Sequence, residues 1–324
     1  MHLLVLLIVA GAVGSRWLHK IVLSRDQLAT AGTVFCGVFV QAIPFLVFGV
    51  VVSGLIAAFL PADRLARWLP RRSGTAILAA AAGGALIPGC ECGSVPVARR
   101  LYGDDDKGTR TLGAAALTFM LAAPAINPVV LVSTAVAFPG QPAMVGARAG
   151  ASLLTALTMG LLWSRFGRAE WVTRRLPATS GPADGAQPRW VVFSEAARHD
   201  FLQSAAYLTL GALSAAALHV LVPPWVFTGL SGHLAAGIIA MAVLAVVLAL
   251  CSEADAFVAS SLTMVPLLPR LVFLVVGPVV DVKLIAMQAG LFGRRFAARF
   301  APAAFVVAIT AATVIGGPLL GGAR

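Results

Sequence analysis

Two long apolar runs, 34–60 and 112–138, contain no charged residue, and they decide the solvent in which this chain can fold. A helix of about 20 apolar residues crosses the roughly 30 Å hydrocarbon core of a bilayer. Only 11% of the residues are charged, whereas a soluble domain is about a quarter charged. The sequence therefore predicts an all-α integral membrane protein with about 7–9 membrane helices, whose main partner is the lipid bilayer. The apolar segments lie at 2–14, 33–60, 74–88, 112–138, 143–165, 201–222, 233–250, 271–291 and 300–320.

The formal net charge of +11 comes from basic residues in short loops beside apolar segments. That placement marks the cytoplasmic side of a membrane and does not indicate nucleic-acid binding. The longest polar stretch, 165–200, contains six arginines and a Ser-Gly-Pro turn. It is predicted to be a cytoplasmic linker loop. Residues 2–14 could be the core of a signal peptide, but they lack its positively charged start, which favours a retained helix.

Similar residues recur in order in the two halves of the chain, which indicates an internal duplication. We expect a first repeat over 1–164 and a second over 201–324, with 143–165 as the first helix of the second repeat. Because a Gln, a Gly, a Cys and prolines keep their order, chance similarity among Ala, Leu and Val is a weaker explanation. At a spacing of 162 residues Gln41, Phe45, Leu46, Gly49 and Pro61 match Gln203, Tyr207, Leu208, Gly211 and Pro223; at 161 residues Cys90, Ala98 and Leu101 match Cys251, Ala259 and Leu262; and Pro124 and Asn127 correspond to Pro278 and Asp281.

Each repeat contains a segment interrupted by residues that break helices or carry charge, 88–96 in the first and 251–255 in the second. Each segment could be a simple span or a re-entrant hairpin. With two hairpins, more Lys and Arg residues fall on the side of the 165–200 loop, so the positive-inside rule favours hairpins by a small margin. Each repeat would then have an odd number of spans and the repeats would be inverted, a common plan for secondary transporters. The predicted helix breaks are Pro88, Gly89, Gly93, Pro96, Pro124, Pro128 and Pro278.

Five charged side chains fall within the apolar segments: Glu91, Glu253, Asp255, Asp281 and Lys283. Such a group costs about 2.5–3.5 kcal/mol at the centre of a membrane helix. The three that lie beside the predicted breaks could be solvated there by freed backbone groups and water. We therefore predict that Glu91 contributes to a substrate site and that the other four serve proton coupling or gating, although Lys283 could lie at a helix end.

Asn127 and Asp281 each follow a proline by three residues. One helical turn separates each pair, so the polar group shares a face with its proline. Proline also frees the carbonyl four residues earlier, here that of Met120 or Leu274. The sequence predicts a local kink and oxygen ligands or proton acceptors at both places. For Asn127, a kink capped by the nearby amide explains the pattern equally well.

Cys90 and Cys92 flank Glu91 at the first interruption, and Cys251 occupies the matching place in the second. If both hairpin tips reach the same depth, these three thiols converge with Glu91 and Ser252. Thiolates are soft ligands that select Cu(I), Hg(II) or trivalent arsenic. We predict a substrate site for a small molecule or soft metalloid, although a buried cysteine is commonly an apolar filler. The sequence predicts no resident metal and no cofactor, and it contains no nucleotide-binding loop.

Four motifs in order resemble the predicted-permease family that includes the ArsP-type organoarsenical efflux permeases. They are Pro-Gly-Cys-Glu-Cys-Gly-Ser-Val-Pro-Val-Ala at 88–98, Ala-Pro-Ala-Ile-Asn-Pro at 123–128, Cys-Ser-Glu-Ala-Asp-Ala-Phe-Val-Ala at 251–259 and Gly-Pro-Val-Val-Asp-Val-Lys at 277–283. The resemblance implies a multi-pass permease of the bacterial inner membrane. It also implies that Cys90 and Cys92, with Cys251, carry trivalent methylated or aromatic arsenicals outward.

The sequence thus favours a secondary-active permease that exports a soft, thiol-reactive substrate. A thiol must lose its proton to bind, so nearby carboxyl groups could couple transport to the proton gradient. A second hypothesis is a permease for a metal cation or a small organic solute, which uses the carboxylates and keeps the cysteines as packing. A third is a membrane thiol oxidoreductase, which the one-residue spacing of Cys90 and Cys92 disfavours. A homo-oligomer is left open.

Overall fold

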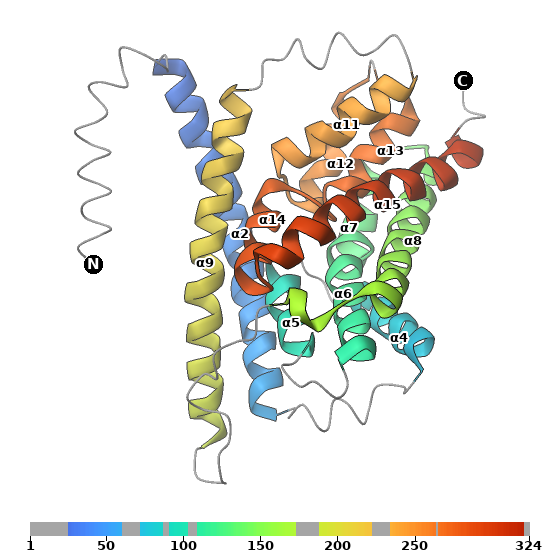
Figure 1. Ribbon diagram of the computed structural model, residues 1–324. Helices are drawn as coiled ribbons and strands as arrows, with labels where there is room; N and C mark the ends of the chain where they lie inside the picture. Colours follow the sequence, from blue (N-terminus) through green and yellow to red (C-terminus); the bar gives the residue numbers. More distant parts are fainter. Residues whose placement is uncertain are drawn as a thin grey trace.

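The computed structural model describes seven stretches of the chain, and every regular element within them is a helix (Figure 1). The predicted all-α class is therefore confirmed for these residues. They are 25–59, 72–86, 91–102, 109–172, 188–221, 234–263 and 265–320. The helices of the first half are α2 (Arg25–Phe59), α4 (Ser73–Leu86), α5 (Glu91–Tyr102), α6 (Thr109–Ala125), α7 (Pro128–Ala137), α8 (Pro142–Phe166) and the short 3-10 helix η1 (Ala169–Trp171). Those of the second half are α9 (Arg189–Leu221), α11 (Leu234–Leu248), α12 (Ser252–Ser261), α13 (Leu267–Val276), α14 (Val282–Leu291) and α15 (Arg294–Leu320).

The surface and the interior have the polarity of a protein dissolved in lipid. Three helical segments are long and apolar enough to cross a membrane: Arg110–Ala137, which combines most of α6 with α7, Pro142–Phe166 and Arg294–Leu320. Large apolar side chains such as Val314 are exposed, whereas charged ones such as Arg148 are fully buried. In hydrocarbon an exposed apolar side chain costs little, but a polar group must find partners inside the protein. The fold is that of a helical membrane protein.

Two helices begin earlier than the apolar segments that predicted them. Helix α2 begins at Arg25 and α9 at Arg189, so the last part of the expected 165–200 loop is helical. The carbonyl of Pro188 accepts the N–H of Val191 at 2.9 Å and opens α9. Residues 189–200 contain no Gly or Pro, and a helix needs no apolar residues to continue beyond the membrane. Hydropathy alone therefore placed these boundaries too late.

Gly93 and Pro96 were predicted as helix breaks, and both lie inside α5 instead. A proline removes one backbone hydrogen bond and strains the preceding turn, but packing against α6 and α2 keeps this short helix continuous. Helix α5 begins at Glu91, so the described part of the predicted interruption, 91–96, is helical. Pro88 and Gly89, the other two residues predicted to break this segment, lie outside the described residues.

The other predicted breaks lie at or beside real interruptions. Pro124 is still helical, in the last turn of α6, and the interruption follows at 126–127. Pro128 takes the first position of α7, where its missing N–H costs nothing. Pro278 lies in the interruption between α13 and α14. The long apolar segments 112–138 and 271–291 are therefore both broken helices.

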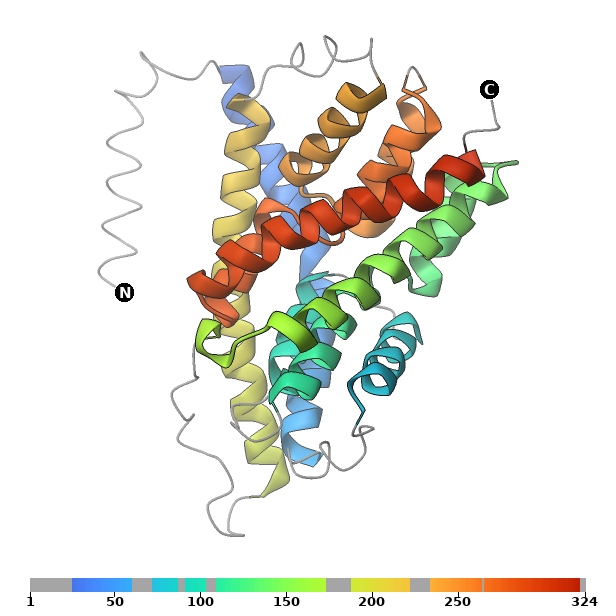
Figure 2. The same cartoon turned by 45° about the vertical axis from the view of Figure 1, so that its right-hand side comes forward.

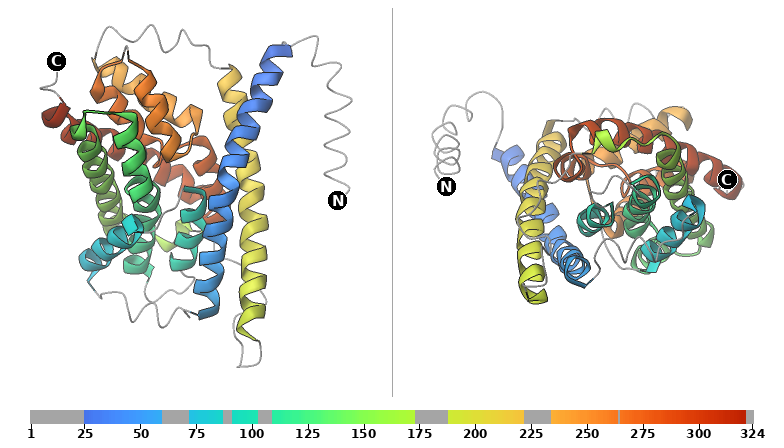
Figure 3. Two further views of the ribbon diagram at one scale, coloured as in Figure 1. Left: turned by 180° about the vertical axis from the view of Figure 1, so that it is seen from behind. Right: turned by 60° about the horizontal axis from the view of Figure 1, so that its bottom comes forward.

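Figures 1 to 3 show how the long, short and broken helices are arranged in the bundle. The long helices α2 and α9 pack side by side and run in opposite directions along one edge (Figures 1 and 3). The short pair α4/α5 lies in the lower half of the bundle and the pair α11/α12 in the upper half, in the turned view as well (Figure 2). Helices α8 and α15 pack against each other and cover the broken helices α6/α7 and α13/α14.

Gly160 marks the closest approach of α8 to α6. A Cβ at this position would lie 2.1 Å from Oγ1 of Thr118, whose side chain is fully buried. We expect Gly160→Ala to lower the free energy of unfolding by about 1–3 kcal/mol, because the helices must move apart. Gly146→Ala on the same helix is the matched control, since a Cβ there meets nothing within 4 Å. Chemical denaturation in detergent measures both; equal stabilities of the two variants would contradict this packing.

Candidate functional site

Asn127 and Asp281 begin the second halves of the two broken helices in the same way. The side chain of Asn127 accepts the N–H of Val130 at 3.0 Å and donates to the carbonyl of Ala123 at 2.8 Å. It therefore ties the end of α6 to the start of α7, as the capping interpretation predicted. Asp281 accepts the N–H of Leu284 at the start of α14. Each cap satisfies a donor that the interruption would otherwise leave without a partner.

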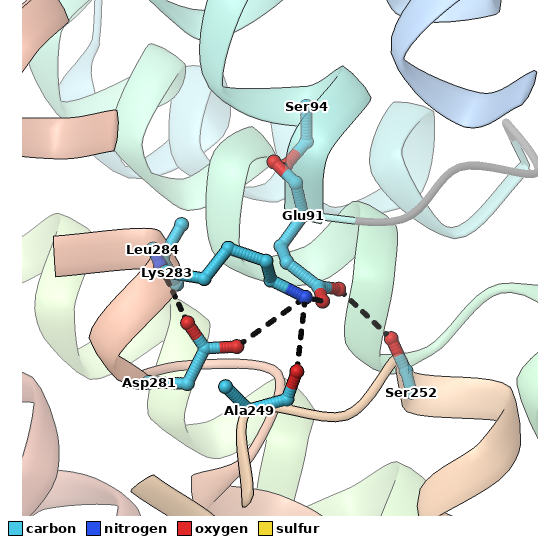
Figure 4. Close-up of polar contacts among 7 residues, drawn as sticks. All are labelled: Glu91, Ser94, Ala249, Ser252, Asp281, Lys283 and Leu284. Carbon is cyan, nitrogen blue, oxygen red and sulfur yellow. Dashed lines mark hydrogen bonds and ion pairs between the residues drawn. The ribbon is translucent and has the colours of Figure 1, made fainter. Parts of the chain in front are cut away.

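The starts of α5 and α14 meet through a buried ion pair. Nζ of Lys283 lies 2.6 Å from Oε1 of Glu91 and 3.6 Å from Oδ2 of Asp281, and all three side chains are fully buried (Figure 4). The predicted charged residues of the first and second halves are thus brought together. Buried charges are stable only when they are paired and hydrogen-bonded, so this contact is a strong constraint on how α5 and α14 pack.

The α11–α12 interruption completes this cluster. The hydroxyl of Ser252 donates to Oε2 of Glu91 at 3.3 Å, and Nζ of Lys283 donates to the carbonyl of Ala249 at 3.4 Å (Figure 4). Ala249 has a φ of +48°, a left-handed conformation that costs a non-glycine residue about 1–2 kcal/mol. Hereafter the polar cluster means Glu91, Asp281, Lys283, Ser252 and the Ala249 carbonyl.

Arg148 of α8 extends the buried polar region to α7. Its Nη1 donates to the hydroxyl of Thr134 at 2.6 Å and its Nη2 to the carbonyl of Ser252 at 2.8 Å, while its Nε has no hydrogen-bond partner in the described part of the chain. The side chain is fully buried. One guanidinium therefore joins α7, α8 and the start of α12, which a planar fork of donors is suited to do.

Asp255 and Glu253 lie close to the cluster without joining it directly. Both interact electrostatically with Glu91, Lys283 and Arg148. Among the described residues, Oδ2 of Asp255 has no hydrogen-bond partner although it is buried, and a Cβ at Gly277 would lie 2.5 Å from it. Oε2 of Glu253 likewise makes no hydrogen bond within this part of the chain. The region thus holds four carboxyl groups and two basic groups, an excess of acid that favours uptake of a proton or a cation.

Two contacts fasten α5 to its neighbours. The hydroxyl of Ser94 donates to the carbonyl of Met120 at 3.1 Å, which is the carbonyl that Pro124 was predicted to free. Near the other end of α5, Nε of Arg99 donates to the carbonyl of Leu291, the last residue of α14, at 3.0 Å. The guanidinium of Arg99 also lies 5.9 Å from the centres of the Tyr102 and Phe292 rings.

The predicted convergence of three cysteines is only partly within the described residues. Cys251 is buried immediately before Ser252 and takes the position that precedes α12. Cys90 lies outside the described residues, and of Cys92 only the helical backbone is described. Among the side chains that the structure describes, no group of three or more His, Cys, Asp or Glu could hold a metal ion.

Arg148, Arg99 and the Ala249 carbonyl were missed by the sequence reading. Both arginines were counted with loop residues, although Arg148 falls within the apolar segment 143–165. Its place as the sixth residue of that segment was the available signal. Nothing in the sequence indicates that Ala249 turns its carbonyl toward a lysine.

Comparison with known proteins agrees with the membrane fold. The model of the predicted permease family ArsP_1 matches residues 27–317. The UPF0718 protein YcgR of Bacillus subtilis is 33% identical over 280 residues, which cover 84% of this chain and 92% of that protein. A Streptococcus mutans protein, named as a proposed subunit of a two-component membrane permease complex, is 28% identical over 288 residues, which cover 87% of this chain and 94% of that one. No solved structure matches the chain.

Proposed function

This chain belongs to the ArsP_1 predicted permease family, and from that premise we propose that it is a multi-pass, secondary-active permease of the bacterial inner membrane. The relatives are named as a subunit of a membrane permease complex and as a UPF0718 protein, and neither name is that of an enzyme. The observation that carries the proposal is the polar cluster, because charged groups from both halves of the chain are fully buried at interrupted helices. Broken helices that present polar groups in the interior are typical of secondary transporters.

The proposed architecture is a pair of inverted repeats, α2–α8 and α9–α15. Helix α4 packs on α6 as α11 packs on α13, and α8 packs on α6 and α7 as α15 packs on α13 and α14. Ser252 and Glu91, which are 161 residues apart in the chain, contact each other, as equivalent residues on a pseudo-twofold axis would. The opposite directions of α2 and α9 suit inversion (Figure 1). In this scheme 143–165 is the last helix of the first repeat and not the first of the second, and α4/α5 and α11/α12 are re-entrant hairpins.

For the substrate we propose a soft, thiol-reactive compound such as a trivalent methylated arsenical, exported in exchange for protons. Cys251 lies next to Ser252, and Ser252 bonds to Glu91. When a thiol exchanges with an arsenic hydroxyl, an As–S bond replaces an As–O bond, and a carboxylate beside the thiol can take the thiol proton and deliver it to the departing hydroxyl, which leaves as water. This exchange neither consumes nor releases a net proton, so a coupled proton would be carried by the carboxyl groups themselves. The carboxyl excess of the region, with Asp255 and Glu253, supports proton coupling.

Export of methylarsenite from cells, together with growth in its presence, tests the thiol site. We expect the wild type to export the compound and Cys90→Ser, Cys92→Ser and Cys251→Ser to lose most of that activity, because serine is a hard and weakly acidic ligand. Cys36→Ser is the matched control, since Cys36 is exposed on α2. If all four variants match the wild type, the cysteines play no part in transport.

A second candidate is a permease for a cation or a small organic solute that uses the carboxyl groups alone. The buried Oδ2 of Asp255, which has no hydrogen-bond partner among the described residues, favours it, because a cation or a proton would satisfy this oxygen. Transport that survives removal of the cysteines but fails in Asp281→Asn would support this candidate. Asp281→Asn keeps an acceptor for the Leu284 N–H, so loss of transport would not follow from loss of the helix cap.

The name of the Streptococcus mutans relative also suggests that this chain works with a second, different subunit. A homo-oligomer is the alternative. Affinity purification of the tagged chain from its native membrane, followed by mass measurement of the intact complex, distinguishes a second subunit from copies of this chain.

A further inference from the structure

The ammonium of Lys283 sits in a shell of oxygens supplied by three separate parts of the chain. Oε1 of Glu91 comes from the start of α5, Oδ2 of Asp281 from the interruption before α14, and the carbonyl of Ala249 from the interruption after α11. The distances are 2.6, 3.6 and 3.4 Å. Carboxylate and backbone carbonyl oxygens converging on one point are the ligand set of a small, hard cation.

The three oxygens lie at unequal distances from Nζ of Lys283. Oε1 of Glu91 is the nearest of them, whereas the buried Oδ2 of Asp281 meets the ammonium as an ion pair at 3.6 Å and makes no hydrogen bond within the described residues. A fully buried carboxylate oxygen without a hydrogen bond is costly. The left-handed backbone of Ala249, which turns its carbonyl toward the same point, adds local strain. Both costs would be offset if the shell also received another cation.

The charges around the shell also favour a cation. Asp255 interacts electrostatically with Lys283, Glu91 and Asp281, and Glu253 with Lys283 and Glu91. The only described basic group near them besides Lys283 is Arg148, which is engaged with Thr134 and the Ser252 carbonyl. Removal of the ammonium would therefore leave an anionic, buried shell that must take up a proton or another cation.

We propose that Lys283 is a tethered cation that occupies, and thereby blocks, a binding site for a small exchangeable cation formed by Glu91, Asp281 and the Ala249 carbonyl. The ammonium holds the two halves of the chain together while the site is empty of cargo. A cation that enters the site displaces the ammonium and releases the contact between α5 and α14. The displacement of the ammonium during transport rests on the proposed permease function. The existence of the cation site does not depend on that function.

Chemical rescue of Lys283→Ala tests the site without any transport measurement. The substitution removes three methylene groups and the amine, which n-propylammonium can replace. We expect the melting temperature of the purified, detergent-solubilised variant to fall by about 5 °C or more, because the Glu91 carboxylate loses its partner. Millimolar n-propylammonium should restore at least half of that loss and leave the wild type unchanged.

Three controls make the result specific. Tetramethylammonium has charge but no N–H donors, and n-propanol has the same chain length without the charge; neither should restore the variant. Lys283→Ala combined with Glu91→Gln should not respond to n-propylammonium, since the strongest oxygen ligand is gone. Equal effects of the amine and the alcohol, or an undiminished effect in the double variant, would reduce the rescue to cavity filling and overturn the proposal.

If Lys283→Ala yields no folded protein, Lys283→Gln keeps most of the side-chain volume and is tested with ammonium ion against tetramethylammonium. A stabilisation specific to ammonium supports the site, and its absence in both variants overturns it. The proposed function fails separately: a rescue by n-propylammonium in a protein whose wild type transports neither methylarsenite nor a cation would leave the cation site and remove the permease role.

Discussion

Glu91→Gln is expected to lower the free energy of unfolding by about 3–5 kcal/mol and to abolish transport. The Lys283 ammonium lies 2.6 Å from Oε1 of Glu91 in a fully buried position, and an amide cannot compensate its charge. Removal of one partner of a buried ion pair costs this much because the other charge is left buried. Titration of the detergent-solubilised protein with a denaturant measures the stability, and efflux from cells measures the transport.

Two further variants show whether the loss of stability comes from the unpaired Lys283 charge or from the change at Glu91 alone. Glu91→Gln combined with Lys283→Met should recover most of the lost stability, because no uncompensated charge remains, but should not recover transport. Glu170→Gln, at an exposed position in η1, should change stability by less than about 0.5 kcal/mol. A double variant as unstable as Glu91→Gln alone would show that the pair is not the source of the loss.

Arg148→Met is expected to lower the free energy of unfolding by about 3 kcal/mol or more. The substitution removes two hydrogen bonds that join three helices and leaves the buried carbonyl of Ser252 without its donor. It also removes a basic group that interacts electrostatically with Asp255 and Glu253. Arg148→Lys should recover only part of the loss, since one ammonium cannot reproduce the fork that spans Thr134 and Ser252.

Arg165→Met, near the exposed end of the same helix, is the matched control and should be close to the wild type. The measurement is the same denaturant titration. If Arg148→Met and Arg165→Met prove equally stable, the hydrogen bonds of Arg148 are not holding α7 and α12 in place.

The sequence was sufficient to identify the charged side chains of the polar cluster, but not to predict which of them contact each other. Glu91, Asp281 and Lys283 were conspicuous because charge is expensive in an apolar segment, and the matching of Glu91 with Ser252 followed from the repeat. The contact of these residues depends on how two interruptions far apart in the chain come together. No local pattern determines that, and the Ala249 carbonyl enters through backbone conformation alone.

Errors in the sequence reading have a common physical origin. Hydropathy reports the solvent that a residue prefers, so it treated Arg148 as a loop residue and began α9 only where the sequence becomes apolar. Proline and glycine report local strain, so they predicted an interruption at Gly93 and Pro96, where tertiary packing overrides it. Pro128 and Pro278 were placed correctly because packing and local strain agree there.

The two ends of α5 are both fastened to α14, Glu91 to Lys283 at the start and Arg99 to Leu291 at the finish. The two helices therefore run parallel and are held together at both ends, although they come from opposite halves of the sequence. Arg148 links α7 with α12 in the complementary pairing. Each of these pairs, α5 with α14 and α7 with α12, joins a helix of the first half of the chain to one of the second half. If the protein opens to one side by a rocking motion, we expect each pair to move as a unit. The moving bodies would then combine segments from both halves of the sequence.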